Sequence, residues 1–275
     1  MKYCKKCLQP DTRPNEKFQN GVCSICSYYD SVSGVEWELR FDQLNSYLRN
    51  RKKKSVKNSF QKFDCLIGVS GGKDSTRQAI WVRDKLGLKP LLWSLAYPPE
   101  QICNTGTDNI SNLINLGFDM VVSSPAPERW RKLIKESFFK FSTHMRASEL
   151  ALFSSVPQAS IYYKIPIIFW GETPMQVGDR SAIGKEGWDG NNMKYSNTLS
   201  SGHSWMLDMG FSQNELLPYI YPASDEFELQ DLQIIYLGWY LGDWSLVNNA
   251  IYSNLNGLSN RKNKPYETGD IHGTS

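Results

Sequence analysis

The stretch that decides the fold is residues 63–80, FDCLIGVSGGKDSTRQAI. Its first part, residues 65–69, is a short apolar run of the kind that forms a buried parallel strand. The run leads into Ser-Gly-Gly-Lys-Asp-Ser at 70–75, and apolar residues then recur at helical spacing. The sequence therefore predicts a strand, a tight glycine turn and the start of a helix.

This turn has the features of a phosphate site. Gly71 and Gly72 allow positive φ and a close backbone approach, so that successive N–H groups point into one concavity. The N-terminus of the following helix adds roughly half a positive charge at the same place. Ser70 and Ser75 add hydroxyl donors, and Lys73 adds a point charge. We therefore expect the turn to bind a phosphate.

The turn is not a Walker A loop, which requires GxxxxGK(S/T), because Asp74 follows Lys73 and the spacing is too short. It resembles instead the SGGxDS signature of the PP-loop ATP pyrophosphatases, matched at Ser70, Gly71, Gly72, Asp74 and Ser75. The resemblance implies that the loop binds the pyrophosphate of ATP while a substrate oxygen is adenylylated. Mg²⁺ is expected with the nucleotide, and Asp74 is the nearest residue to hold it. A glycine turn that binds nothing, capped by Ser70 or Asp74, is the alternative.

Four of the six cysteines form a second motif at the N-terminus. Cys4 and Cys7 make one CxxC pair, Cys23 and Cys26 make another, and residues 8–22 lie between them. This spacing is typical of a zinc ribbon, in which four thiolates fill every coordination position of Zn²⁺. Because so small a module has almost no core, we expect the metal to hold its fold. An iron–sulfur cluster would suit the same ligands, and unliganded surface thiols are the alternative without a metal.

Composition limits the class of protein. The 275 residues are 40% hydrophobic and 13% aromatic, which is enough for a globular core in one or two domains. A net charge of +3 does not indicate nucleic acid, which we expect not to be a partner. Neither a membrane segment nor a signal peptide is evident, and the cysteine usage suggests a reducing compartment. We therefore expect a cytoplasmic protein.

Helices and strands alternate along the chain. Residues 35–49 predict an amphipathic helix, and the cations between Arg49 and Lys62 predict a solvated basic linker, with phosphate or partner docking as the alternative. Beyond the loop, apolar runs predict strands, and helical patterns lie between them: strands at 90–97, 118–122 and 165–170, helices at 109–116, 130–141 and 149–163. Residues 232–240 indicate an added strand and 244–255 a helix. This alternation predicts an α/β fold with a doubly wound parallel sheet, whose ligands bind beyond the carboxyl ends of the strands.

The order of the motifs narrows the resemblance to one group of PP-loop enzymes. The ribbon, SGGKDS, NTGTDNISNLINLGFD at 104–119 and IPIIFWGE at 165–172 together resemble the N-acetyl sugar amidotransferases of surface-polysaccharide (lipopolysaccharide, O-antigen) synthesis. These enzymes use ATP to turn a sugar acetamide into an acetamidine. The resemblance implies an acetamido sugar substrate, UDP-linked in our interpretation. It also implies a partner glutaminase and an ammonia-channel synthase subunit that deliver ammonia.

By position, the resemblance places Thr105, Gly106 and Asn109 in a loop near the nucleotide, and Gly171 and Glu172 at the end of the last strand. The candidate catalytic residues are Lys73, Asp74 and Glu172. The other candidate ATP-binding residues are Ser70, Gly71, Gly72, Ser75, Thr105, Asn109 and Gly171. Asn109 as a helix cap and Glu172 as a solvated loop residue are the alternatives.

The predicted organisation has four parts: a zinc ribbon at 1–30, a helix and basic linker at 31–62, an ATP-binding domain at 63–178, and a lid loop with a substrate or partner segment at 179–275. The glycine-rich stretch 177–192 is interpreted either as an idle surface loop or as a lid that carries cations to the phosphates. Family members usually continue past the region resembling 265–275 into another helix. We therefore expect a fragment or a short form, without any site built from that tail.

Two other functions fit parts of the pattern. Zinc ribbon plus PP-loop also describes tRNA thiolases, which need catalytic cysteines in the α/β domain, where this chain has only Cys65 and Cys103. Cys65 begins a predicted buried strand, and a strongly basic domain is missing. The third function is a non-catalytic adaptor for the glutaminase and synthase subunits. The intact SGGKDS argues against an adaptor, and the expected missing tail argues for it.

Overall fold

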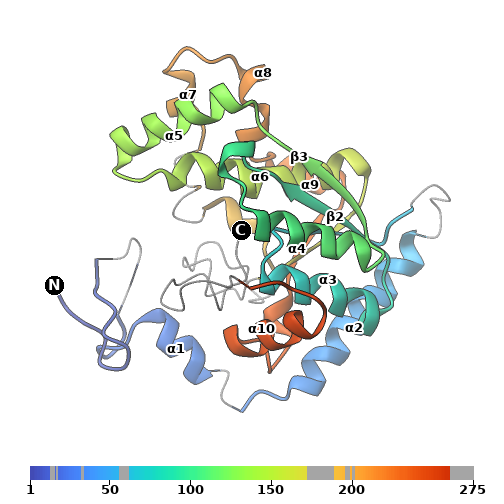
Figure 1. The fold of residues 1–275 in the computed structure, drawn as a ribbon. Helices are drawn as coiled ribbons and strands as arrows, with labels where there is room; N and C mark the ends of the chain where they lie inside the picture. The colour runs from blue at the N-terminus through green and yellow to red at the C-terminus, as the bar shows by residue number, and fades with distance from the viewer. Residues whose placement is uncertain are drawn as a thin grey trace.

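A five-stranded parallel sheet forms the centre of the molecule (Figure 1). The computed structural model describes residues 1–12, 16, 18–31, 34–55, 62–171, 189–195, 199 and 202–260, with the backbone alone for 52–55, 100 and 195. The strand order is β3-β2-β1-β4-β5. The strands are β1 (Cys65–Gly68), β2 (Pro90–Leu95), β3 (Asp119–Ser123), β4 (Ile167–Trp170) and β5 (Gln233–Tyr236). The predicted doubly wound α/β sheet is confirmed, including the strand indicated at 232–240.

Both faces of the central strands are buried. Leu66 and Ile168 belong to one hydrophobic cluster, while Ile67 and Phe169, their neighbours along the strands, belong to the other. All four side chains are inaccessible to solvent. A strand covered on both faces reads as a continuous apolar run, which is why β1 and β4 could be recognised in the sequence.

Helices pack on both faces of this sheet. One cluster joins the sheet to α2 (Trp37–Ser55), α3 (Lys73–Leu86), α4 (Asn104–Asn115) and α10 (Leu246–Leu255). The other joins it to α5 (Pro127–Phe141), α6 (Met145–Tyr163), α7 (Ser204–Leu207), α8 (Gln213–Leu216) and α9 (Ser224–Leu229). Short 3-10 helices lie at Pro99–Gln101, Asn191–Tyr195, Leu217–Tyr219 and Leu237–Trp239. The sequence placed the end of the ATP-binding domain at residue 178. Strand β5 and helix α10 lie beyond this residue and belong to the same sheet and core.

Helix α2 runs further than the sequence predicted, and part of the expected basic linker is helical. It continues through Arg51 to Ser55, because Arg and Lys are good helix formers. Arg51 pairs with the Asp231 carboxylate at 3.0 Å and donates to the carbonyl of Pro166 at 3.4 Å. This cation therefore ties α2 to the segments just before β4 and β5, which corrects the interpretation of a solvated linker at this position.

The N-terminal module contacts the core through aromatic rings. Helix α1 (Ser24–Ser31) brings Tyr28 to 6.1 Å from the ring of Trp239. Arg40 of α2 lies 3.6 Å above the same indole and donates to the Trp239 carbonyl at 2.8 Å. Trp37 packs so closely on Gly242 that a Cβ there would lie 2.7 Å from the indole. Tyr28 of the module and two residues of α2 therefore contact the segment that leads from β5 into α10.

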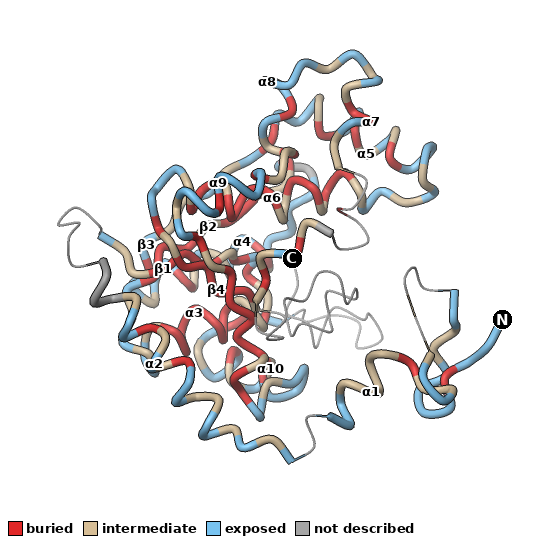
Figure 2. The backbone as a smooth tube through the Cα atoms, turned by 180° about the vertical axis from the view of Figure 1, so that it is seen from behind, coloured by how far each residue is buried: buried red, intermediate tan, exposed pale blue. Residues whose placement is uncertain are grey.

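Burial differs sharply between the α/β core and the N-terminal module (Figure 2). Strands β1, β2, β4 and β5 and the helix faces around them are largely buried, whereas edge strand β3 and most of the N-terminal module are exposed or half-buried. In the part of the chain that the structure describes, no helix has the length and apolar character needed to cross a bilayer.

Candidate functional site

The four N-terminal cysteines converge on one point. Their Sγ atoms all lie within 4.8 Å of one another. Tight turns bring the two pairs together, with Asn20 and Gly21 in the left-handed region at φ of 54° and 79°. Helix α1 begins directly after Cys23, which places Cys26 in its first turn. Four sulfur ligands at this separation fit a tetrahedral metal or an iron–sulfur cluster.

Backbone N–H groups point at two of these sulfurs. Cys4 Sγ accepts from the N–H groups of Lys6 at 3.4 Å and Cys23 at 3.3 Å, and Cys23 Sγ accepts from Cys26 at 3.4 Å. Burial raises the pKa of Cys4, but the N–H groups of Cys23, Cys7 and Lys6 outweigh burial and lower the pKa to about 6. At Cys4 these hydrogen bonds favour the thiolate, which is the form that ligates metals, whereas burial raises the pKa of Cys23 and the hydrogen bond with the Cys7 thiol raises the pKa of Cys26.

The glycine loop follows β1 at the carboxyl edge of the sheet. Gly71 has a φ of 76°, as predicted for a glycine at a close turn. Gly72 has a φ of −85°, which other residues also adopt, so the expectation of positive φ is wrong there. A Cβ on Gly71 would lie 3.3 Å from the Ile110 side chain and 3.4 Å from Asn109 and from the Gly106 carbonyl oxygen. The loop is therefore packed against α4.

Two serines hold the shape of the loop. Ser75 Oγ accepts from the N–H of Ser70 at 3.3 Å and donates to the carbonyl of Gly72 at 3.2 Å. Ser70 Oγ accepts from the N–H of Gly72 at 3.3 Å. These hydroxyl contacts lie within the loop itself. Donation from either serine to a phosphate stays a prediction.

Helix α3 starts at Lys73 with Gly72 as its N-cap residue, and no side chain caps it. The N–H of Thr76 makes the bond to the Gly72 carbonyl, at 3.0 Å. The preceding N–H groups therefore have no partner within the helix, and the helix dipole makes this end attractive to an anion. The alternative in which Asp74 caps the helix is wrong, because its carboxylate is engaged elsewhere.

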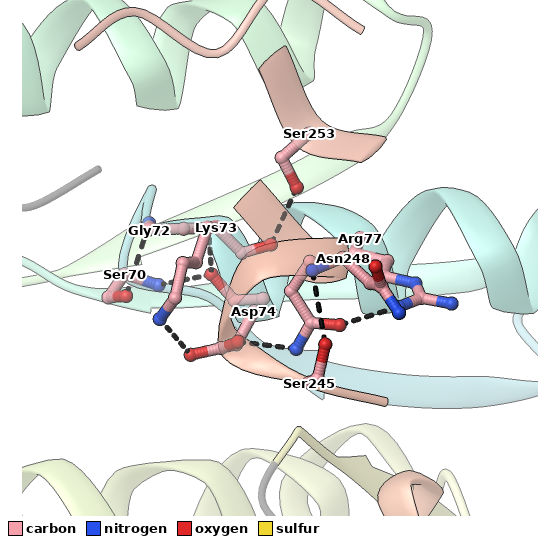
Figure 3. Close-up of polar contacts among 10 residues, drawn as sticks. Ser70, Gly72, Lys73, Asp74, Arg77, Ser245, Asn248 and Ser253 are labelled. Carbon is pink, nitrogen blue, oxygen red and sulfur yellow. Dashed lines mark hydrogen bonds and ion pairs between the residues drawn. The ribbon is translucent and has the colours of Figure 1, made fainter. Parts of the chain in front are cut away.

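Both oxygens of the Asp74 carboxylate have donors (Figure 3). Oδ2 accepts from Lys73 Nζ at 2.7 Å, and Oδ1 accepts from Asn249 Nδ2 at 2.5 Å. Asn249 Oδ1 accepts in turn from Arg77 Nη1 at 2.6 Å, and Arg77 also pairs with Asp243 at 2.6 Å. The Lys73, Arg77 and Asn249 residues are 4%, 3% and 1% exposed, whereas the Asp74 side chain is 37% exposed. One partly open carboxylate therefore stands on a buried polar network.

The partners of this network on α10 could not be recognised in the sequence. Asn249 lies 175 residues after Asp74, and Ser253, whose hydroxyl donates to the Lys73 carbonyl at 2.6 Å, lies 180 residues after Lys73. The helical pattern at 244–255 predicted the helix correctly. It carried no sign that the polar side of the helix is buried, because Asn and Ser on a helix ordinarily face solvent.

A pocket of about 400 Å³ opens beside the loop. Its walls include the loop, Gln78 of α3, Trp93 of β2, Trp170 of β4 and Gly171. Side-chain N–H groups of Gln78, Trp93 and Trp170 are buried without a hydrogen-bond partner in the described part of the chain. A Cβ on Gly171 would lie 2.9 Å from Gln78 Oε1, so these two residues meet closely. Gly171 thus lies where the sequence placed it, while Glu172 lies outside the described residues.

Helix α4 corrects the expected nucleotide loop. The segment is helical from Asn104, and Cys103 is its N-cap residue, its sulfur accepting from the N–H of Gly106 at 3.3 Å. Thr105 is in the first turn and does not line the 400 Å³ pocket. Asn109 is fully buried and exchanges two hydrogen bonds with the Ser259 backbone, at 3.1 and 2.7 Å. Asn109 is therefore neither a loop residue nor a helix cap.

The pocket fits a phosphate-bearing ligand. Lys73 and the N-terminus of α3 both favour an anion with many acceptor oxygens. Among the lining residues that the structure describes, Asp74 is the one carboxylate, and a carboxylate is the hard oxygen ligand that Mg²⁺ prefers. A nucleoside triphosphate with Mg²⁺ satisfies both requirements.

Neither a protein-family model nor a curated protein matches the chain. Solved structures that resemble it include NMN synthetase from Francisella tularensis (15% identity, 78% of this chain and 94% of that chain, TM-score 0.34). An NH3-dependent NAD synthetase from Campylobacter jejuni has 12% identity over 71% of this chain and 92% of its own, with a TM-score of 0.36. The U34-tRNA thiolase NcsA from Methanococcus maripaludis, with a 4Fe-4S cluster, has 16% identity over 93% and 80%, with a TM-score of 0.29. Likenesses this distant carry no argument about what this chain does.

Proposed function

We propose that this chain is a cytoplasmic ATP-dependent amidotransferase of the PP-loop type. It converts the N-acetyl group of a nucleotide-linked sugar to an acetamidino group and forms AMP and pyrophosphate. The observation that carries the proposal is the SGGKDS loop between β1 and α3, with Asp74 held at the edge of the pocket. Strand β1 lies between β2 and β4, and the chain builds the sheet in one direction from β1 to β3 and in the other from β4 to β5. Parallel sheets bind ligands at such a topological switch point.

The chain's own groups suit the first chemical step. The acetamide oxygen attacks the α-phosphorus of ATP, an O–P bond forms, and the bond to the β-phosphate breaks to release pyrophosphate. Negative charge then grows on the leaving group, where N–H groups at the start of α3 and the Lys73 ammonium stabilise it. Asp74 is the residue placed to hold Mg²⁺, which neutralises phosphate oxygens when bound.

The second step needs ammonia. The first step leaves an O-adenylyl imidate. Ammonia adds to the imidate carbon, the bond from this carbon to the adenylylated oxygen breaks, and AMP leaves with both electrons of that bond to give the amidine. Ammonium is a weak nucleophile at neutral pH, so a glutaminase and an ammonia-channel subunit are part of the proposal as partners. The N-terminal cysteines in this proposal hold a structural Zn²⁺, since four ligands leave no open coordination position.

A tRNA thiolase is the second candidate, because four clustered cysteines also suit an iron–sulfur cluster. Burial in β1 raises the pKa of Cys65 well above its ordinary value, so its thiol is a poor nucleophile. Cys103 caps α4 and does not line the 400 Å³ pocket. The described part of the α/β domain therefore offers little support for cysteine-based sulfur transfer, which favours the amidotransferase.

The test is product analysis. The full chain is incubated with ATP, Mg²⁺ and ammonium at mildly alkaline pH, with a panel of UDP-linked acetamido sugars. We expect AMP and pyrophosphate together with a sugar product whose mass falls by the difference between O and NH. A parallel reaction with tRNA and sulfide tests the second candidate. ADP and inorganic phosphate as the main products would exclude both, since they indicate cleavage at the γ-phosphate.

A further inference from the structure

The orientation of the Asn249 amide is fixed by its neighbours. Arg77 is always a donor, so the amide oxygen of Asn249 must face Arg77 Nη1, at 2.6 Å. The amide NH₂ is thereby directed at Asp74 Oδ1, at 2.5 Å. A reversed amide would set its NH₂ against the Arg77 donor and its oxygen against the Asp74 carboxylate, so both neighbours favour the same orientation.

This geometry immobilises one oxygen of Asp74 and leaves the other exchangeable. Lys73 Nζ holds Oδ2 from a side chain that also lines the pocket. When a phosphate draws Lys73 away, Oδ2 becomes available to a cation while Asn249 still holds Oδ1. A carboxylate with one fixed oxygen keeps its direction, and a ligand that keeps its direction binds a metal more tightly.

Helix α10 is anchored so that it can serve as the support. Ser245 caps its first turn by accepting from the N–H of Asn248 at 3.1 Å, and Asn248 Nδ2 donates to the carbonyl of Asp243 at 3.0 Å. Further along, Ser253 bonds the Lys73 carbonyl at 2.6 Å (Figure 3). Asp243, just before the helix, pairs with Arg77 of α3, so α3 is contacted on both sides of Asn249.

We propose that Asn249 is the positioning residue of the nucleotide site, which holds the Asp74 carboxylate in the direction that a nucleotide-bound Mg²⁺ requires. The inference rests on the proposed function, because it assumes that the pocket takes a Mg²⁺–nucleotide. It adds a residue that lies outside the SGGKDS motif and outside the lining of the pocket. Asn249 acts only through Asp74 and touches no reacting atom.

The experiment measures binding and does not depend on turnover. Binding of α,β-methylene-ATP, which resists cleavage between the α- and β-phosphates, is followed by calorimetry over a Mg²⁺ series and in EDTA. In Asn249→Ala the Mg²⁺ concentration for half-maximal binding should rise about 10–100-fold, as for loss of an outer-shell partner of a metal ligand. The affinity for the nucleotide in EDTA should change little, since the N–H groups at the start of α3 and the Lys73 ammonium remain.

Asn254→Ala is the matched control, because Asn254 has the same side chain on the same helix but is exposed. It should leave the Mg²⁺ series unchanged. If Asn249→Ala does not fold, Asn249→Ser, which keeps a polar side chain, replaces it. A purely structural role for Asn249 would lower the melting temperature and the active fraction, yet leave the half-maximal Mg²⁺ concentration of the folded protein unaltered.

A double-mutant cycle decides whether Asn249 acts through Asp74. The double variant Asp74→Asn with Asn249→Ala should bind no worse than Asp74→Asn alone, because the second change has nothing left to position. Additive losses, or a half-maximal Mg²⁺ concentration in Asn249→Ala within about twofold of the original, would overturn the inference alone. Absence of Mg²⁺-dependent nucleotide binding in the unmodified chain, or no effect of Asp74→Asn, would overturn the proposed use of the pocket as well.

Discussion

The cysteine cluster and the glycine loop are built in opposite ways. All four cysteines fall within the first 26 residues, and the module around them buries few side chains. The loop, in contrast, stands on a two-sided core, and its Asp74 is held by a residue 175 positions away. We therefore expect the first site to depend on a bound metal for its shape, whereas the second is held by the packed core around it.

The difference matters for how each site fails. Removing the metal from a module without a core removes the main term that folds it. Removing one side chain from the loop site leaves the sheet intact and alters only the chemistry. The segment just before α10 contacts both regions, since Trp239 meets Tyr28 of the N-terminal module and Asp243 pairs with Arg77 of α3.

The largest effect we expect is at the cysteine cluster. Cys23→Ser should abolish metal binding and unfold residues 1–30 while the α/β core stays folded, because structural zinc contributes about 10–16 kcal/mol to such modules. Metal analysis and hydrogen exchange of the module measure the two outcomes. Cys103→Ser is the control and should keep its metal, since a serine can still cap α4. Freshly purified protein with neither zinc nor iron would refute the prediction.

At the loop, Asp74→Asn should leave the fold intact and lower AMP formation about 100-fold or more, roughly 3 kcal/mol, through loss of a charge that matters as pyrophosphate leaves. Lys73→Ala should instead weaken ATP binding by about 1–2 kcal/mol, as for one charge-assisted hydrogen bond. Single-turnover AMP release and equilibrium ATP binding separate the two. Near-normal release in Asp74→Asn with loss in Lys73→Ala would reverse the assigned roles.

The two loop glycines should differ in stability. Gly71→Ala places a side chain at φ of 76° against α4 and should cost about 1–2 kcal/mol or more in urea unfolding. Gly72→Ala, at φ of −85°, should unfold much like the original protein but bind ATP less well, because its Cβ obstructs approach of the phosphates. Equal destabilisation by both changes would mean that the loop conformation differs from the one described.

The smallest effect concerns Arg40 of α2, which stacks on Trp239 where Tyr28 of the N-terminal module also meets that ring. Arg40→Ala removes the cation stacked on Trp239 and its hydrogen bond, and should cost about 1 kcal/mol without releasing metal. Arg40→Lys keeps the charge but loses the planar stacking, so its loss should be similar or slightly smaller. Thermal melting with metal analysis checks both. Loss of metal in Arg40→Ala would show that the module is not independent of the core.

The sequence by itself determined the parallel sheet, the positions of its strands, the glycine turn and the clustering of Cys4, Cys7, Cys23 and Cys26. The strands, the turn and the cluster each follow from a pattern confined to a few residues: continuous apolar runs, paired glycines, and CxxC spacing. The parallel sheet follows from the alternation of strands with helices along the chain. Such patterns set local backbone conformation. Local conformation is sufficient to define a site when the residues that form it are joined by a short loop.

Only the tertiary structure decided that Asn249 holds Asp74, that Asn109 bonds the backbone of Ser259, and that Arg51 ties α2 to the start of β5. A polar residue on a helix reads the same whether it meets solvent or a buried carboxylate. The distinction arises when β5 joins β4 and brings α10 against α3. The partners of Asp74 are therefore a property of the sheet order, which no local spacing encodes.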